Sequence, residues 1–144
     1  MTIMFRRVAA AAVLLAASLP AFAEEQKAAP EAQPIPTLHC EFKSVNACST
    51  DGACKAGSDL AGMPLPLKVT VDFENTVVSA VDETGYARTD NIDAVVESGG
   101  QLMVHGIDRA FGWQIVIHQA SPAASVSFAS ADTVISGFGT CTNK

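Results

Sequence analysis

The sequence predicts an all-β fold of about eight short antiparallel strands, arranged as an up-and-down meander in a barrel or half-closed barrel. Apolar and polar residues alternate with a period of two in several segments, which is the pattern of a strand with one buried face. Turn-forming residues separate these segments at short intervals. After residue 23, no segment has the apolar period of a helix. Four cysteines predict that disulfides hold the fold together.

The first 23 residues predict an export signal. Arg6 and Arg7 form its charged region, residues 8–19 its apolar core, and residues 21–23 (Ala-Phe-Ala) its cleavage site. The apolar run is shorter than the roughly 20 residues that a membrane-spanning helix needs. We therefore expect a periplasmic or secreted protein that does not insert into a membrane after the signal is removed.

The remaining chain predicts a lead followed by one domain. Residues 24–36 are polar and rich in proline, which is typical of a disordered lead. Residues 37–144 are enough for a single β domain with one core. Removing the signal leaves seven Lys and Arg against fifteen Asp and Glu, a net charge of −8. Such a surface repels nucleic-acid phosphate and anionic lipid, so neither is expected as a partner.

Eight segments carry the strand pattern. The clearest is residues 67–74, where Leu, Val, Val and Phe alternate with Lys, Thr, Asp and Glu. In chain order the expected strands are residues 38–43, 67–74, 77–81, 92–96, 101–108, 113–119, 124–128 and 133–142. Residues 82–91 are expected to form a polar loop. In the last strand, Gly137 and Gly139 predict a bulge or the close approach of another backbone.

Residues 101–119 predict a central hairpin. Residues 109–112 (Arg-Ala-Phe-Gly) fit a four-residue turn in which Gly112 takes a positive φ. That turn places Asp108 opposite Trp113. The face expected in the core consists of Leu102, Val104, Trp113, Ile115 and Ile117. We expect these and the other apolar strand residues to fill the barrel, although an eight-strand barrel can also hold one small apolar ligand.

All four cysteines follow the export signal, so two disulfides are expected in an oxidising compartment. Three pairings are possible, and we favour Cys48 with Cys54 and Cys40 with Cys141. The first pair closes a short loop of turn-forming residues. The second joins the first strand to the last, which are antiparallel neighbours in a closed meander of even strand number. A zinc site is the alternative, but the spacing of the cysteines lacks the close pair that such sites use.

The chain resembles small exported bacterial β-meander proteins of unknown function. The resemblance covers the domain and consists of the export signal, an early cysteine, a cysteine-containing loop and the terminal Gly139-Thr140-Cys141. It implies no activity.

Met103, His105 and His118 fall on the outer face of the expected hairpin, with Met103 opposite His118. A thioether and two imidazoles suit copper, so these residues are a candidate metal site. The alternative, two exposed histidines on a solvated face, is favoured because the ligands are few.

The sequence gives no sign of an enzyme. It contains no G-x-S-x-G motif, no glycine-rich phosphate loop and no carboxylate pair that marks a glycosidase. We expect no cofactor. The expected function is a binding or protein-interaction module whose partner is a protein or a small apolar ligand. The alternative is an inhibitor of a secreted hydrolase that presents the Cys48–Cys54 loop, since a closed loop loses little freedom on binding.

Overall fold

The computed structural model describes residues 34–144, so the expected signal peptide (1–23) and most of the expected lead (24–36) lie outside the described residues. The described chain is all-β. Because these residues form strands and turns only, none of their segments is a helix that could cross a membrane. The strands are β1 (Leu38–Ser49), β2 (Cys54–Ala56), β3 (Asp59–Leu60), β4 (Met63–Pro64), β5 (Leu67–Asp72), β6 (Val77–Val81), β7 (Ala87–Asn91), β8 (Ala94–Ser98), β9 (Gln101–Asp108), β10 (Phe111–His118), β11 (Ala123–Ala129) and β12 (Thr133–Thr142).

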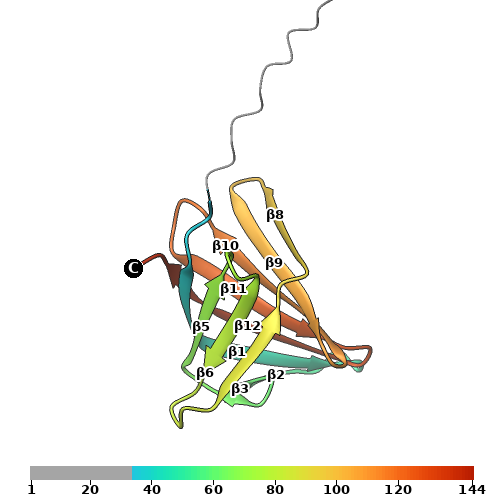
Figure 1. The fold of residues 1–144 in the computed structure, drawn as a ribbon. Helices are drawn as coiled ribbons and strands as arrows, with labels where there is room; N and C mark the ends of the chain where they lie inside the picture. The colour runs from blue at the N-terminus through green and yellow to red at the C-terminus, as the bar shows by residue number, and fades with distance from the viewer. Residues whose placement is uncertain (1–33) are drawn as a thin grey trace, which may run out of the picture. The chain divides into compact units, whose positions relative to one another are not determined.

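The main sheet is antiparallel and curls into a half-barrel (Figure 1). Its strand order is β7-β6-β5-β1-β12-β11-β10-β9-β8. β2 pairs with the C-terminal part of β1, and β3 and β4 form a separate two-stranded hairpin. Strands that are consecutive in the chain are neighbours from β5 to β7 and from β8 to β12. The meander is thus joined between its first and last strands, and its two edges are β7 and β8.

The ladder between β1 and β12 contains the first disulfide. These strands pair over ten residues, and Cys40 lies directly opposite Cys141, with 4.0 Å between the Cα atoms. Both cysteines are buried in the core. The second disulfide joins Cys48 to Cys54, which are opposite each other on β1 and β2. Both expected pairings are therefore confirmed, and the two bridges fit an oxidising compartment outside the cytoplasm.

A bulge in β1 explains one of the glycines in β12. Phe42 pairs with Gly139 and Ser44 with Phe138, so the intervening Lys43 is the extra residue. A Cβ atom at Gly139 would lie 2.0 Å from the backbone oxygen of Glu41. The expected close approach of another backbone is confirmed here, because only glycine lets β1 lie so near.

The central hairpin differs from the expectation in its turn. Phe111, and not Trp113, lies opposite Asp108, so the turn is the two-residue Arg109-Ala110. Arg109 takes the positive φ of 55°, and the expected positive φ of Gly112 is wrong. The register therefore differs by two residues. Because side chains alternate with a period of two, the expected core face is unchanged, and its five members are buried.

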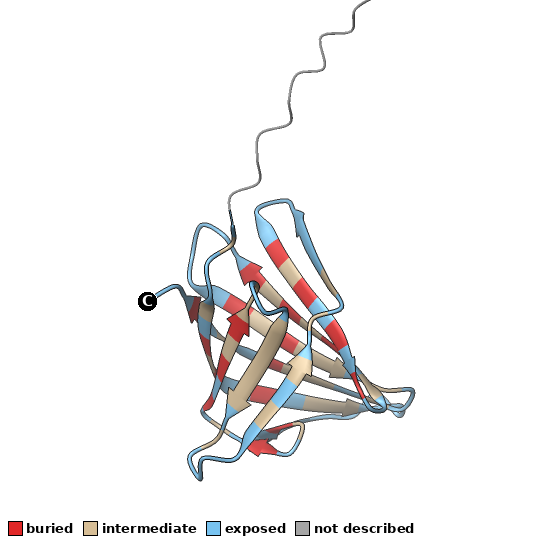
Figure 2. Cartoon of the chain, viewed as in Figure 1, coloured by how far each residue is buried: buried red, intermediate tan, exposed pale blue. Residues whose placement is uncertain are grey.

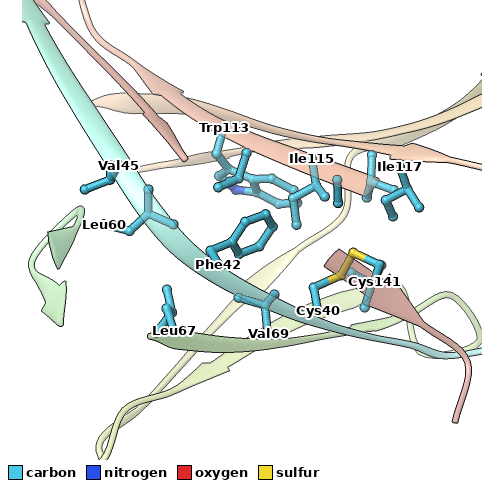
Figure 3. Packing of buried hydrophobic residues seen from close by; sticks show 14 of the residues in the cluster. Cys40, Phe42, Val45, Leu60, Leu67, Val69, Trp113, Ile115, Ile117 and Cys141 are labelled. Atoms are coloured by element: carbon cyan, nitrogen blue, oxygen red, sulfur yellow. A yellow bond between two sulfur atoms is a disulfide. The ribbon is translucent and has the colours of Figure 1, made fainter. Parts of the chain in front are cut away.

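Buried side chains from both halves of the sheet meet inside the half-barrel (Figure 3). Along β9 and β10, buried and exposed residues alternate (Figure 2). Leu60 and Met63 of the β3–β4 hairpin are 2% and 4% exposed, so this hairpin plugs the barrel. The buried apolar residues are Cys40, Phe42, Val45, Leu60, Met63, Leu67, Val69, Val71, Leu102, Val104, Trp113, Ile115, Ile117, Ala124, Val126 and Cys141.

The two disulfides should differ in their contribution to stability. Cys40 and Cys141 are 101 residues apart, whereas Cys48 and Cys54 are six apart. In the chain-entropy model, closing these two loops stabilises the folded state by about 5 kcal/mol for Cys40–Cys141 and about 2 kcal/mol for Cys48–Cys54. Replacing Cys40 and Cys141 together by alanine should lower the urea midpoint much more than replacing Cys48 and Cys54 together. Equal losses in the two double variants would contradict the prediction.

Candidate functional site

The clearest candidate for a contact surface is an exposed apolar row at one end of the sheet. Cross-strand pairing aligns one residue from each of six strands on the outer face. We call this row the outer strip, and its members in spatial order are Ile107, Gly112, Ala129, Val134, Cys48 and Cys54. Ile107 and Val134 are 71% and 43% exposed. At the usual strand spacing, the row extends about 24 Å across the sheet.

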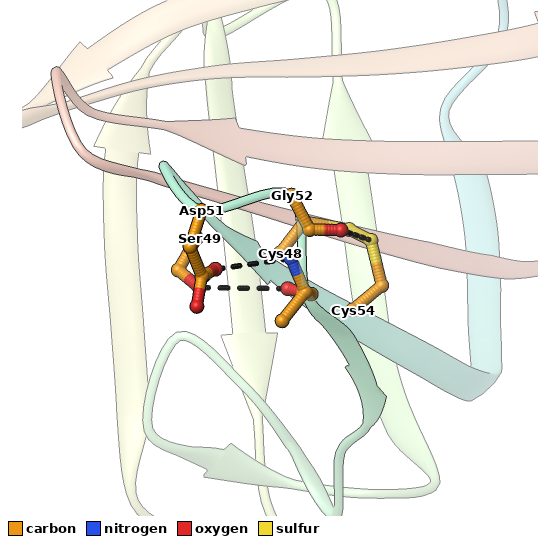
Figure 4. The surroundings of a disulfide bond; sticks show 6 residues. Cys48, Ser49, Asp51, Gly52 and Cys54 are labelled. Atoms are coloured by element: carbon orange, nitrogen blue, oxygen red, sulfur yellow. Dashed lines mark hydrogen bonds between the residues drawn. A yellow bond between two sulfur atoms is a disulfide. The ribbon is translucent and has the colours of Figure 1, made fainter.

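The disulfide loop continues the outer strip at the β1–β2 end (Figure 4). Its turn is held by its own polar groups: Asp51 accepts hydrogen bonds from the Ser49 hydroxyl at 2.6 Å and from the Ala53 backbone N–H at 3.0 Å. These bonds, the Ser49 hydroxyl first, lower the pKa of Asp51. Gly52 adopts the positive φ of 79° that the turn requires. The loop therefore presents a fixed shape before any partner binds.

The structure separates the residues of the candidate copper site. Met103 lies opposite Val116, and not opposite His118 as expected, because the true turn shifts the register. His105 lies opposite Gln114, four residues from His118 along β10. The two histidines share the outer face, but their Cα atoms are on the order of 13 Å apart along the strand direction. Within residues 34–144, no three His, Cys, Asp or Glu side chains gather around one point.

The acidic loop between β6 and β7 uses its first carboxylate for its own turn. Asp82 accepts hydrogen bonds from the Thr84 hydroxyl at 2.6 Å and from the backbone N–H groups of Thr84 and Tyr86. These bonds, the Thr84 hydroxyl first, hold the pKa of Asp82 below its ordinary value. The carboxylate thus fixes the turn that leads into β7.

A buried ion pair, which sequence reasoning missed, joins β7 to β9. The Arg88 guanidinium contacts the carboxylate of Asp108, and its Nη1 donates to the Ala61 backbone oxygen at 3.1 Å. The Asp108 side chain is 10% exposed and that of Arg88 is 29% exposed. One side chain therefore links an edge strand, the plug hairpin and the hairpin β9–β10. Asp108 falls on the core face of its strand, and that position was a signal that it needs a cationic partner.

β7 also approaches β9 through the backbone. The Asp93 N–H donates to the His105 oxygen at 2.9 Å, just after β7 ends. A Cβ at Gly106 would lie 2.6 Å from the Asn91 oxygen. The two edges of the half-barrel therefore meet where residues 91–93, which connect β7 to β8, contact residues 105 and 106 of β9.

The described domain has at least three hollows, one of them a shallow one over β1, β5 and β6. The cavity inside the barrel is about 40 Å³ and is lined mainly by apolar side chains, together with Arg88 and Asp90. That space suits bound water, because pockets for drug-sized ligands are about 300–1,000 Å³. The barrel is therefore filled by its own side chains. The second hollow is a cleft of about 700 Å³ at the end of the strands opposite the outer strip.

Comparisons with known proteins leave the geometry as the basis for a functional proposal. The chain matches no protein-family model, and comparisons with curated proteins and with solved structures found no match.

Arg88→Met should destabilise the protein, because it removes the close cation of the buried Asp108 carboxylate and leaves only the exposed Arg109, whose Nε is 4.0 Å away. We expect a loss of about 2–4 kcal/mol in urea unfolding, since breaking one partner of a buried pair is costly. Adding Asp108→Leu in the same chain should recover part of the loss, because the lone charge is then removed. A double variant less stable than Arg88→Met would contradict this account.

Thr84→Val should raise the pKa of Asp82 toward its ordinary value of 3.8, because it removes the largest cause of the shift. In the wild type the folded pKa is depressed, so the ionised carboxylate stabilises the turn above about pH 3.8, and this contribution is lost as the pH falls through the folded pKa. Carboxyl carbon shifts followed by NMR measure the titration. Asp72, whose lowered pKa depends on Asn75, is the internal control and should not move. An unchanged Asp82 titration would refute the assignment.

Proposed function

We propose that the protein is exported by the signal in residues 1–23 and acts in the periplasm or outside the cell. Two features support this proposal. The signal has the charged, apolar and small-residue regions that export requires. The described domain contains four cysteines, all paired in disulfides, which persist in oxidising compartments.

We further propose that the domain is a binding module without catalysis, and that it engages a partner protein through the outer strip. The observation that carries this proposal is the alignment of six apolar or small residues in one row at the end of the sheet where the disulfide loop lies. Ile107 and Val134 are large exposed apolar side chains on a rigid sheet, so they need no ordering when they bind. The small residues Gly112 and Ala129 lie between Ile107 and Val134 and make the row continuous, and contiguous exposed apolar surface is typical of interaction surfaces.

Inhibition of a secreted hydrolase is a second candidate, and the geometry of the Cys48–Cys54 loop favours it. The loop is closed by a disulfide, fixed by the hydrogen bonds of Asp51, and placed at the end of the outer strip. A loop that keeps its shape loses little conformational entropy in a complex. In this form of the proposal the loop enters the hydrolase and the outer strip contacts its rim.

Val134→Lys tests the proposed surface, because it places a charge in the middle of the outer strip. The matched control is Tyr86→Lys, which changes another exposed apolar side chain, in the β6–β7 turn. After chemical crosslinking in the cell envelope, a partner should be captured by the wild type and by the control, and its yield should fall at least about tenfold with Val134→Lys. The proposal fails if Val134→Lys captures that partner as well as the control does, or if the wild type captures none.

A further inference from the structure

β8 is an edge of the sheet that is open on one side. The strand order ends at β8, so within residues 34–144 only β9 pairs with it. Figure 1 shows β8 at the margin of the half-barrel. Its residues Val95 and Val96 are 39% and 43% exposed. The other edge, β7, carries Arg88 and Asp90 beside the barrel cavity, and inward-pointing charges of this kind resist the addition of a strand.

The turn between β8 and β9 determines which backbone groups of β8 point away from the sheet. Gly99 and Gly100, with φ of 60° and 75°, form a two-residue turn, so the residues on either side of it exchange both backbone hydrogen bonds. Bonded and non-bonded pairs alternate along an antiparallel ladder, and Val95 and Glu97 fall in non-bonded pairs. Their N–H and C=O groups therefore point to the open side, where no backbone group of residues 34–144 bonds them.

The side chains of β8 give this edge a chemical preference. Val96 lies on the outer face beside Met103 of β9, which in turn pairs with Val116 of β10. Glu97 lies on the inner face and is exposed, and no ion pair among the described residues includes it. Lys144 lines the same end cleft as Glu97 without forming such a pair. An added strand would be stabilised by an apolar residue opposite Val96 and a cation opposite Glu97.

Charge argues against a second copy of this chain on the open edge. In a symmetric antiparallel pair of β8 strands, the outward-pointing residues of one copy lie opposite those of the other. A pair centred on Glu97 places the two Glu97 carboxylates opposite each other, and a pair centred on Val96 places them in diagonal positions. A pair centred on Val95 places Glu97 opposite Asp93. Each register brings like charges together, which destabilises the pairing.

The chain's own residues before the domain are also unsuited to this edge by their composition. Residues 24–33 contain three glutamates and one lysine, and Pro30 has no N–H to donate to a ladder. They include no β-branched or aromatic residue, which are the types that pack well on a sheet. The pattern of β8 therefore favours a different polypeptide.

We propose that the open edge of β8 binds a basic, extended segment of a partner polypeptide as an additional antiparallel strand. Val95 and Glu97 each exchange two backbone hydrogen bonds with the segment. The Glu97 carboxylate pairs with a Lys or Arg side chain, and Val96 contacts an apolar one. After residue 23 the chain has seven Lys and Arg against fifteen Asp and Glu, an excess that favours the approach of a cation. The edge is separate from the outer strip, so this inference stands independently of the function proposed above.

The probe is the peptide acetyl-Thr-Lys-Val-Val-Thr-Lys-amide, titrated into the purified protein and followed by amide shifts in NMR. Its first lysine is opposite Glu97 and its first valine is opposite Val96. Saturable shifts should centre on residues 94–98 with a Kd of about 0.1–1 mM. N-methylation of that lysine should abolish binding, because its N–H faces β8. N-methylation of that valine, whose N–H points away, should change the Kd less than about threefold.

Glu97→Lys tests the charge, and Glu74→Lys is the matched control. Glu74 is exposed in the turn after β5, so both variants change the net charge by the same amount. Glu97→Lys should weaken binding of the lysine peptide at least about tenfold and should favour a peptide with glutamate at both lysine positions. Glu74→Lys should keep the preference of the wild type.

The inference is overturned if the peptide shifts lie elsewhere or fail to saturate. It is also overturned if the two N-methylated peptides bind alike, or if Glu97→Lys keeps the same preference as Glu74→Lys. Hydrogen exchange of the free protein provides the last test. Slow exchange of the Val95 and Glu97 amides without peptide would contradict the proposal, because a second copy or the chain's own residues before Pro34 would then occupy the edge.

Discussion

The pairing of β1 with β12 is the constraint on which the rest of the structure depends. It joins the two ends of the folded chain over ten residues and encloses the Cys40–Cys141 disulfide in the core. Without it, the sheet would separate into one part with β1, β2 and β5–β7 and another with β8–β12. The bulge at Lys43 and the contact at Gly139 show how closely the two backbones are fitted. The bulge also keeps Phe42 and Val45 on the inner face although three positions separate them.

This ladder also connects the two ends of the half-barrel. β1 begins at the end cleft with Leu38 and reaches the outer strip at Cys48. β12 runs in the opposite direction, from Val134 in the outer strip to Cys141 at the floor of the cleft. Each disulfide therefore lies at one end of the same strand pair. The rigidity of the outer strip has its origin in this ladder, because paired strands have little conformational freedom left to lose.

The fold class and the buried faces could be predicted because period-two alternation is a local property of the sequence. The predicted core face was correct even though the predicted hairpin turn was wrong. A register difference of two residues leaves every side chain on its face, whereas a difference of one would have exchanged the faces. β7 was expected to be part of a polar loop. Its residues are Ala-Arg-Thr-Asp-Asn, and an edge strand with so few apolar side chains carries little alternation. The β3–β4 plug escaped prediction because two-residue strands are too short to show a period.

The candidate surfaces depend on neighbours across strands, which alternation alone cannot identify. The outer strip exists only because Gly112 is level with Ile107 and Val134 with Cys48, and the expected register placed other residues together. The partner of Asp108 likewise comes from β7, twenty residues earlier in the chain. The disulfides could be predicted from the sequence. An export signal implies an oxidising compartment, and four cysteines allow only three pairings.

Native-state hydrogen exchange tests the central role of the β1–β12 ladder most directly. If this ladder holds the sheet together, the amides of β1 and β12 that bond across it, such as those of the pair Glu41 and Thr140 next to Cys40–Cys141, should exchange only through global unfolding. Amides at the edges, in β7 and β8, should exchange through smaller local openings with lower free energies. Equal protection at the edges, or faster exchange in β1 and β12 than in β8, would contradict the account.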